Sequence, residues 1–165
     1  MILTGGKVVL RPGSPDDVER LASILAEPSV ASRWGGFTLD EIAEQFVESE
    51  LAFVVTVEDD VVGVIQFGEE EDPMYQHASI DIFLTTTRQD QGIGRDAIRT
   101  LARYLIDERG HHRLSIDPAA DNHRAIRAYE AVGFRRVGVL RSYERGPDGT
   151  WHDGVLMDLL AGELR

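Results

Sequence analysis

The chain has no cysteine among its 165 residues. Disulfide bonds, thiolate metal ligands and a cysteine nucleophile are therefore excluded, and the absence of thiols fits a reducing compartment. No apolar run is long enough to cross a bilayer, and Met1 to Lys7 lacks the basic and apolar regions of a signal peptide. We expect a cytoplasmic protein with no membrane segment.

An excess of basic residues is also lacking, since Lys and Arg number 17 against 29 Asp and Glu, a formal net charge of -12. This balance argues against a nucleic-acid partner and favours capture of a cationic substrate, although acidic surfaces also simply keep proteins soluble. The five histidines show no ligand spacing on an expected helix. We therefore expect no bound metal.

Repeats, low-complexity tracts and linkers are missing as well, while 42% of the residues are hydrophobic. A chain of this length holds one core of reasonable size, so residues 1–165 are expected to form a single domain. Apolar periodicity, capping residues and turn residues then divide the chain into alternating elements. Helices are expected over residues 14–27, 38–50, 92–109 and 122–132. Strands are expected over residues 7–11, 51–57, 61–67, 77–85, 112–117, 135–140 and 155–160.

The turn Gln89-Asp90-Gln91-Gly92-Ile93-Gly94 joins an expected strand to an expected helix. Its glycines allow the backbone to approach a ligand closely, and the free N–H groups of the first helical turn bind phosphate oxygens. The three glycines of a dinucleotide-binding fingerprint and the Gly-Lys-Ser/Thr of a P-loop are both absent. The turn predicts a nucleotide or pyrophosphate ligand of another kind.

This turn resembles the Q/R-x-x-G-x-G/A loop of the GCN5-related N-acetyltransferases, and Asn122 to Phe134 resembles a second landmark of that superfamily. The resemblance covers nearly the whole chain. It implies an α/β fold with a mixed, mostly antiparallel central sheet of about six to seven strands and helices on both faces. It also implies acetyl-CoA as the cofactor.

Three further segments are similar to the aminoglycoside 6'-N-acetyltransferases: Trp34 to Phe46, Glu69 to Asp81, and Ile116 to Phe134. The chain departs from that family in a longer loop after Asp72 and in Phe67-Gly68, where paired tryptophans are expected. The tail from Gly149 to Leu160 also looks like the tails of ribosomal-protein and diamine acetyltransferases. These are the main catalytic competitors.

Acetyl transfer to an amine needs a group that accepts the ammonium proton and a group that protonates the leaving thiolate. The resemblance places Tyr129 beside the cofactor sulfur as the acid. Without the resemblance, a single tyrosine would be interpreted as a core residue. Asp81 and Asp117 lie in otherwise apolar strands, and a carboxylate there needs a partner or a function. By resemblance both hold substrate amines, with Asp81 the base, directly or through water. Asp117 could instead cap an Asp-Pro turn.

The turn chemistry and the resemblance together imply the remaining contacts. Cofactor contacts are expected from Phe83, Leu84, Thr85, Gln89, Gln91, Gly92, Ile93, Gly94, Arg95, Asn122, Ala125 and Tyr129, and Arg88, Arg95 and Arg124 could lie near its phosphates. Substrate contacts are expected from Trp34, Phe46, Glu70, Glu71, Asp72, Asp81 and Asp117. A run of acids is more often a solvated loop, and the two aromatics could equally belong to the core.

The resulting hypothesis is an N-acetyltransferase that transfers acetyl from acetyl-CoA to a primary amine of a small polycationic acceptor in a ternary complex. The 6'-amine of aminoglycosides, in a resistance-type activity, is the first candidate. A protein N-terminus, a diamine or another small amine remains an alternative acceptor. An alternative of another class is a noncatalytic acyl-CoA-binding sensor. The chain could act as a monomer or as a homodimer.

Overall fold

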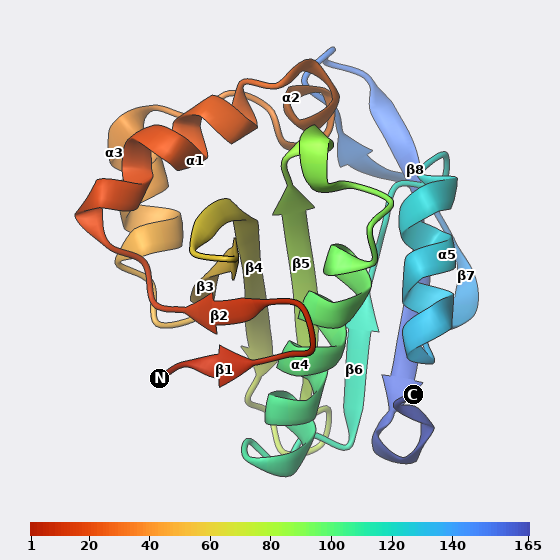
Figure 1. Ribbon diagram of the computed structural model, residues 1–165. Coiled ribbons are helices and arrows are strands. Elements are labelled where there is room, and N and C mark those ends of the chain that lie inside the picture. The colour runs from red at the N-terminus through yellow and green to blue at the C-terminus, as the bar shows by residue number, and fades with distance from the viewer.

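The computed structural model describes residues 1–165 and contains one eight-stranded sheet with the order β1-β2-β3-β4-β5-β6-β8-β7 (Figure 1). The β5–β6 pair is parallel and the other neighbours are antiparallel. The strands are β1 (Leu3–Thr4), β2 (Val9–Arg11), β3 (Ala52–Val57), β4 (Asp60–Glu70), β5 (His77–Leu84), β6 (Arg113–Ile116), β7 (Arg135–Arg145) and β8 (Trp151–Leu160).

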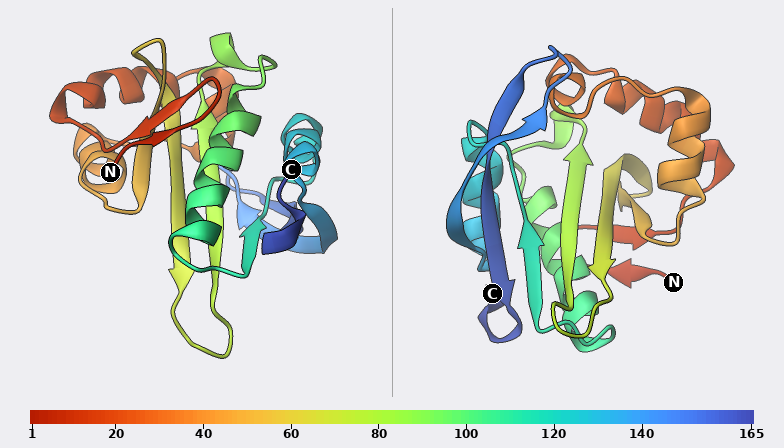
Figure 2. Two further views of the ribbon diagram at one scale, coloured as in Figure 1. Left: turned by 60° about the horizontal axis from the view of Figure 1, so that its bottom comes forward. Right: turned by 180° about the vertical axis from the view of Figure 1, so that it is seen from behind.

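Five α-helices cover the two faces of this sheet (Figures 1 and 2). They are α1 (Val18–Leu25), α2 (Pro28–Trp34), α3 (Leu39–Ile42), α4 (Ile93–Asp107) and α5 (His123–Val132). A 3-10 turn, Pro15–Asp17, leads into α1, and a π turn, Ala43–Val47, continues α3. None of these helices combines the length and the apolar content that crossing a bilayer requires.

Strand alternation explains why there are two cores. On β3, Phe53 and Val55 face the larger core, which includes the buried residues of α4 and α5. The intervening Ala52 and Val54 face a smaller core with α1, α2 and α3. The α4–α5 layer and the α1–α3 layer therefore lie on opposite faces, as the mixed α/β fold class predicts.

The sheet opens in its middle, where its only parallel pair is short. β5 and β6 pair only at Ala78 with Leu114 and at Ser79 with Ser115, although β5 continues to Leu84. Beyond these pairs the two strands no longer hydrogen-bond to each other. The part of β5 beyond these pairs lies near the N-terminal ends of α4 and α5 (Figure 1).

The structure differs from the sequence-based expectation in four elements. β1 and α2 were not expected, so the sheet has eight strands where six to seven were predicted. Helix α2 has seven residues and only Val30 is buried, which is too short a pattern for apolar periodicity to detect. β7 and β8 are longer than predicted. Their added residues escaped the prediction because they are mostly exposed and show no apolar alternation.

Candidate active site

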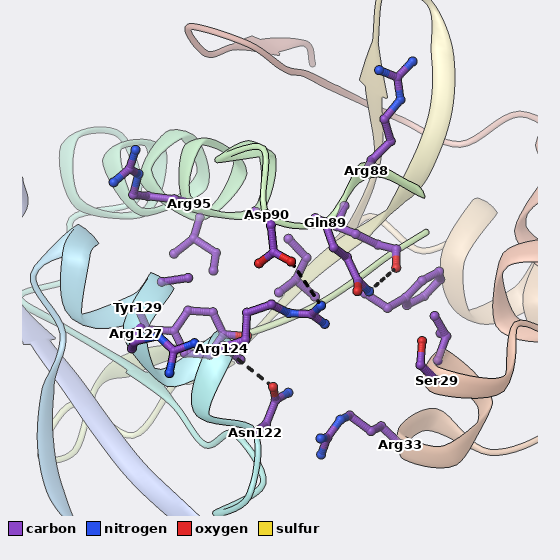
Figure 3. Close-up of a pocket in the computed structure, with 18 of the residues that line it drawn as sticks. Ser29, Arg33, Arg88, Gln89, Asp90, Arg95, Asn122, Arg124, Arg127 and Tyr129 are labelled. Atoms are coloured by element: carbon purple, nitrogen blue, oxygen red, sulfur yellow. Dashed lines mark hydrogen bonds and ion pairs between the residues drawn. The ribbon is translucent and has the colours of Figure 1, made fainter. Parts of the chain in front are cut away.

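A cleft of about 560 Å³ lies where β5, α4 and α5 meet, and α2 forms its remaining wall (Figure 3). The glycine turn enters α4 here. Gly92 is the residue before the helix and has φ 77°, a left-handed conformation that glycine adopts without strain. Gly92, Gly94 and Arg95 all line the cleft, so the first turn of α4, whose N–H groups have no acceptor within the helix, borders this space.

Two side chains of the turn and one from a distant segment hold the turn in place. Gln89 Nε2 donates to the Leu84 carbonyl over 3.3 Å, and Gln91 Nε2 donates to the Thr87 carbonyl over 3.0 Å. The ammonium of Lys7 donates to the Gln91 carbonyl over 2.8 Å. The turn is therefore fixed before any ligand binds, which lowers the ordering cost of binding.

The carboxylate of Glu27 holds the segment that leads into this turn. It accepts hydrogen bonds from Thr85 Oγ1 at 2.6 Å and from both the N–H and the Oγ1 of Thr86 at 2.7 Å. Burial alone would raise the pKa of Glu27, but the bonds from the two threonines outweigh it and lower that pKa. The junction between α1 and α2 is thereby joined to the end of β5.

The cleft is strongly basic, since five arginines line it against one acid, Asp90. These arginines are Arg33, Arg88, Arg95, Arg124 and Arg127. Three form ion pairs: Arg33 with Asp121, Arg88 with Asp60, and Arg124 with Asp90. A helix N-terminus beside several guanidinium groups suits an anionic ligand with phosphate groups.

Tyr129 projects from α5 into the inner end of this cleft and is 8% exposed. Asn122 begins the helix, and its Oδ1 accepts the N–H of Ala125 over 3.3 Å. Burial raises the pKa of Tyr129 above its ordinary value, and the negative charges of Asp81 and Asp117 raise it further. The phenol is therefore protonated at neutral pH and can donate a proton.

A second cleft, of about 720 Å³, is lined by residues of α3, β4 and β5. Its lining contains four carboxylates and no Lys, Arg or His. The carboxylates are Glu41, Glu44, Asp81 and Asp117. This cleft suits a cation, whereas the first suits an anion.

Asp81 lies in this acidic cleft, and its pKa is raised above the ordinary value of an aspartate. Partial removal of its carboxylate from water raises the pKa of Asp81 to about 7, and the charges of Asp117 and Glu144 add to the effect. A hydrogen bond of 2.9 Å from the Ile82 N–H to its Oδ1 offsets part of the shift. The side chain still reaches solvent through the cleft. A carboxyl group that titrates near neutrality is able to accept a proton from an amine.

Sequence reasoning missed Tyr143 and Glu144, which β7 brings to the same place. The register of β7 against β8 shifts between Leu140 and Glu144, and Ser142 has φ 47°. Tyr143 donates its hydroxyl to Asp117 Oδ2 over 2.5 Å, and this bond is the main reason that the pKa of Tyr143 rises to about 12. Asp117 thus has a side-chain partner in the cleft beyond any turn-capping role. No sequence signal marks such a register shift.

Most of the residues predicted to contact the cofactor meet in the basic cleft. They are Phe83, Leu84, Gln89, Gly92, Gly94, Arg95, Asn122, Ala125 and Tyr129. Three others do not line it. Thr85 is buried and bonded to Glu27, Ile93 is buried in the core, and Gln91 turns its side chain towards Thr87.

The predicted substrate residues are more scattered. Asp81 and Asp117 line the acidic cleft, but Trp34 lines the basic one, with its ring 5.0 Å from that of Phe83. Phe46 has no exposed surface, because it packs between Trp34, Phe37 and Phe83. It therefore forms no wall of either cleft.

The acidic run that begins at Glu69 also lies outside the acidic cleft. β4 continues to Glu70, so the run starts within a strand, and Glu69 pairs with Arg109 and His111. Glu70 is the last residue of β4, and Glu71 and Asp72 follow in the turn of the β4–β5 hairpin, which projects beyond the sheet in Figure 2. None of them contributes to the cleft lining.

Comparison with known proteins assigns the chain to a family. The family model for an acetyltransferase (GNAT) domain matches residues 7–135. The aminoglycoside N(6')-acetyltransferase type 1 of Klebsiella pneumoniae is 29% identical over 164 residues, which cover 86% of this chain and 79% of that protein. A GNAT-family acetyltransferase from Bacillus anthracis has the same fold, with a TM-score of 0.86, 19% identity, and coverage of 99% of this chain and 100% of that chain.

The aminoglycoside acetyltransferase AAC(6')-Ib, solved with paromomycin and acetyl-CoA, matches at a TM-score of 0.76 with 26% identity, covering 95% of this chain and 96% of that chain. The family model spans most of the sequence, and the basic cleft has the helix terminus and arginines that a phosphorylated cofactor needs. The chain therefore belongs to the GNAT acetyltransferases, which use acetyl-CoA.

Proposed function

We propose that this acetyltransferase acts on a primary amine of a small polycationic acceptor, with the 6'-amine of aminoglycosides as the first candidate. The observation that carries the proposal is the opposite charge of the two clefts that β5 borders. Arginines line one cleft, and carboxylates without any cation line the other. An anionic acetyl donor and a cationic acceptor would each be attracted to a different side of the same strand.

The residues at this junction supply the proton transfers that the reaction needs. When bound, acetyl-CoA supplies the reactive thioester. Asp81 removes a proton from the acceptor ammonium, directly or through a water molecule, and leaves a neutral amine able to attack. Asp117, held by Tyr143, fixes the acceptor through its charge. Tyr129 gives its phenolic proton to the departing thiolate, and the second proton that the attacking nitrogen loses as the amide forms returns to the phenolate.

The similarity to aminoglycoside N(6')-acetyltransferases supports this acceptor class. The acidic cleft gives independent support, since a polyamine gains from several carboxylates whereas a peptide N-terminus offers one fixed charge. Phe46 is fully buried and the acids of the hairpin do not line the acidic cleft, and these two facts change which residues we assign to the acceptor. Glu41 and Glu44 replace Glu70, Glu71 and Asp72 in this role.

Release of coenzyme A tests the proposal with purified protein and a panel of acceptors. The panel contains kanamycin, tobramycin, amikacin, spermidine and an alanine-terminated peptide. Neomycin and paromomycin form a matched pair, because paromomycin carries a hydroxyl in place of the 6'-amine. Turnover of neomycin with none of paromomycin is expected. Turnover of spermidine or the peptide alone would reject the aminoglycoside assignment while retaining the family chemistry.

A noncatalytic sensor would need the basic cleft but neither Tyr129 nor Asp81. The Tyr129→Phe variant keeps the ring and its packing and removes only the acid. We expect unchanged coenzyme A binding by calorimetry and a fall in turnover of about 100-fold. Unchanged turnover would remove Tyr129 from the mechanism. Absence of turnover by the unmodified protein with every acceptor, together with normal coenzyme A binding, would favour the sensor.

A further inference from the structure

The basic cleft is crossed by an ion pair of its own. Asp90 in the glycine turn and Arg124 in the first turn of α5 approach to 3.9 Å between Oδ2 and the guanidinium NH1 atom. Figure 3 shows the two side chains extended towards each other from opposite sides of the cleft. Both remain accessible, with 75% of the Asp90 side chain and 46% of the Arg124 side chain exposed. A ligand entering the cleft meets this pair directly.

The turn places the Asp90 carboxylate where it is. Asp90 has φ 60°, and its neighbours Gln89 and Gln91 are each anchored to a backbone carbonyl. The ammonium of Lys7 donates to the Gln91 carbonyl of the same turn. Asp90 is also the only acid among the residues that line this cleft. One carboxylate is thus held at the entrance of an otherwise cationic site.

We propose that Asp90 is an internal counter-ion that occupies Arg124 until a phosphate group of acetyl-CoA displaces it. Asp90 then sets the affinity for the cofactor, because each binding event must first break the pair. The same carboxylate also repels the incoming phosphate. This inference rests on the acetyl-CoA part of the proposed function and does not depend on which amine is the acceptor.

The exposure of both partners limits the size of the effect. Exposed ion pairs contribute little in water and are screened by salt, so removal of the Asp90 charge should tighten cofactor binding by roughly two- to fivefold. The substitution Asp90→Asn suits the test, since asparagine tolerates the left-handed conformation at this position as well as aspartate does. The backbone of the turn should therefore not change.

Calorimetric titration with coenzyme A measures the affinity without any acceptor or turnover. The variants are Asp90→Asn, Arg124→Gln and the double variant, each measured at low and at high salt. Glu130→Gln is the matched control, because it removes one charge from an exposed pair with Arg136, and neither residue lines the cleft. Dephospho-coenzyme A, which lacks the 3'-phosphate, separates that phosphate from the pyrophosphate as the competing group.

We expect Asp90→Asn to tighten coenzyme A binding two- to fivefold at low salt. The gain should be smaller at high salt, and smaller in the Arg124→Gln background, where only the direct repulsion between Asp90 and the phosphate is removed. Glu130→Gln should leave the affinity unchanged. If Asp90→Asn also tightens the binding of dephospho-coenzyme A, the pyrophosphate is the group that competes with Asp90 for Arg124. If it does not, the 3'-phosphate is the competing group. If Asp90→Asn bound coenzyme A no more tightly than the unmodified protein, this inference would be overturned and the proposed function would stand. No coenzyme A binding by the unmodified protein would overturn it together with the acetyl-CoA part of the proposed function.

Discussion

The carboxyl group of Asp81 has a pKa of about 7, and this changes how the protein should respond to pH. If Asp81 is the base, turnover must follow its ionised fraction. We expect kcat/KM to rise with pH through about 7 and then level off. Asp81→Asn should lower kcat by about 100-fold and remove this dependence. A variant that retained the same pH profile would assign the titration to another group.

The same pKa has a consequence for stability that does not depend on turnover. The folded protein binds the Asp81 proton more tightly than the unfolded chain, in which the ordinary pKa is 3.8. The free energy of unfolding therefore falls as pH rises between these two pKa values. Asparagine carries no such charge. The change in melting temperature caused by Asp81→Asn should therefore be more positive at about pH 8 than at about pH 4. Equal shifts at both pH values would contradict the raised pKa.

Tyr143 is the residue whose role is least visible in the sequence. Its hydroxyl donates to Asp117, and its phenol comes from the irregular part of β7. Tyr143→Phe should raise KM for the acceptor by about tenfold, since a hydrogen bond to a charged group is lost, and should leave coenzyme A affinity unchanged. The exposed Tyr75 supplies the control, Tyr75→Phe. Equal acceptor KM values for the two variants would remove Tyr143 from the acceptor site.

At the scale of elements, the end of β5 and the turn before α4 behave as one unit that Glu27 holds. Glu27→Gln keeps the shape but loses one acceptor oxygen for the Thr85 and Thr86 donors. We expect KM for acetyl-CoA to rise about fivefold with little change in kcat, because loosening of this segment adds an ordering cost to cofactor binding. Glu27→Asp keeps both acceptor oxygens on a shorter side chain, so its KM for acetyl-CoA should remain above that of the unmodified protein. A parallel fall in kcat and thermal stability, with KM unchanged, would show a purely structural role.

Element prediction from the sequence succeeded where local chemistry is strong. Ser14 and Thr38 cap their helices as expected, and Gly110 and Gly133, both with positive φ, follow the ends of α4 and α5. It failed for α2, whose pattern is too short, and for β7, whose residues are exposed along its length. Local preferences therefore positioned the cofactor side of the site better than the acceptor side.

The acceptor side depends on contacts between segments far apart in the chain. The charge run at Glu69 is conspicuous in the sequence, yet strand pairing carries it to the far end of the β4–β5 hairpin. Glu41 and Glu44 are unremarkable in sequence, and the packing of α3 brings them to the cleft that holds Asp81. Register and helix packing decide these positions, and neither is encoded by composition.

At the scale of the whole molecule, the effect of charges that line the acidic cleft can be separated from the effect of the protein's net charge. Glu41→Gln with Glu44→Gln removes two charges from the cleft, and glutamine preserves the capping geometry at position 41. Glu70→Gln with Glu71→Gln removes two charges from the hairpin turn. The first pair should raise KM for a polycationic acceptor by about fivefold at low salt, and the second should change it less than twofold. Equal effects would indicate that net charge alone attracts the acceptor.

The opposite charges of the two clefts also bear on how the reaction ends. An acceptor amine enters as a cation, and its acetylated form is a neutral amide. The product therefore carries one positive charge fewer than the substrate in a cleft lined by Glu41, Glu44, Asp81 and Asp117. Its attraction to that cleft weakens at the moment of transfer. The acidic lining that draws a polyamine in thus favours departure of the product over rebinding, so inhibition by accumulated product should be weak.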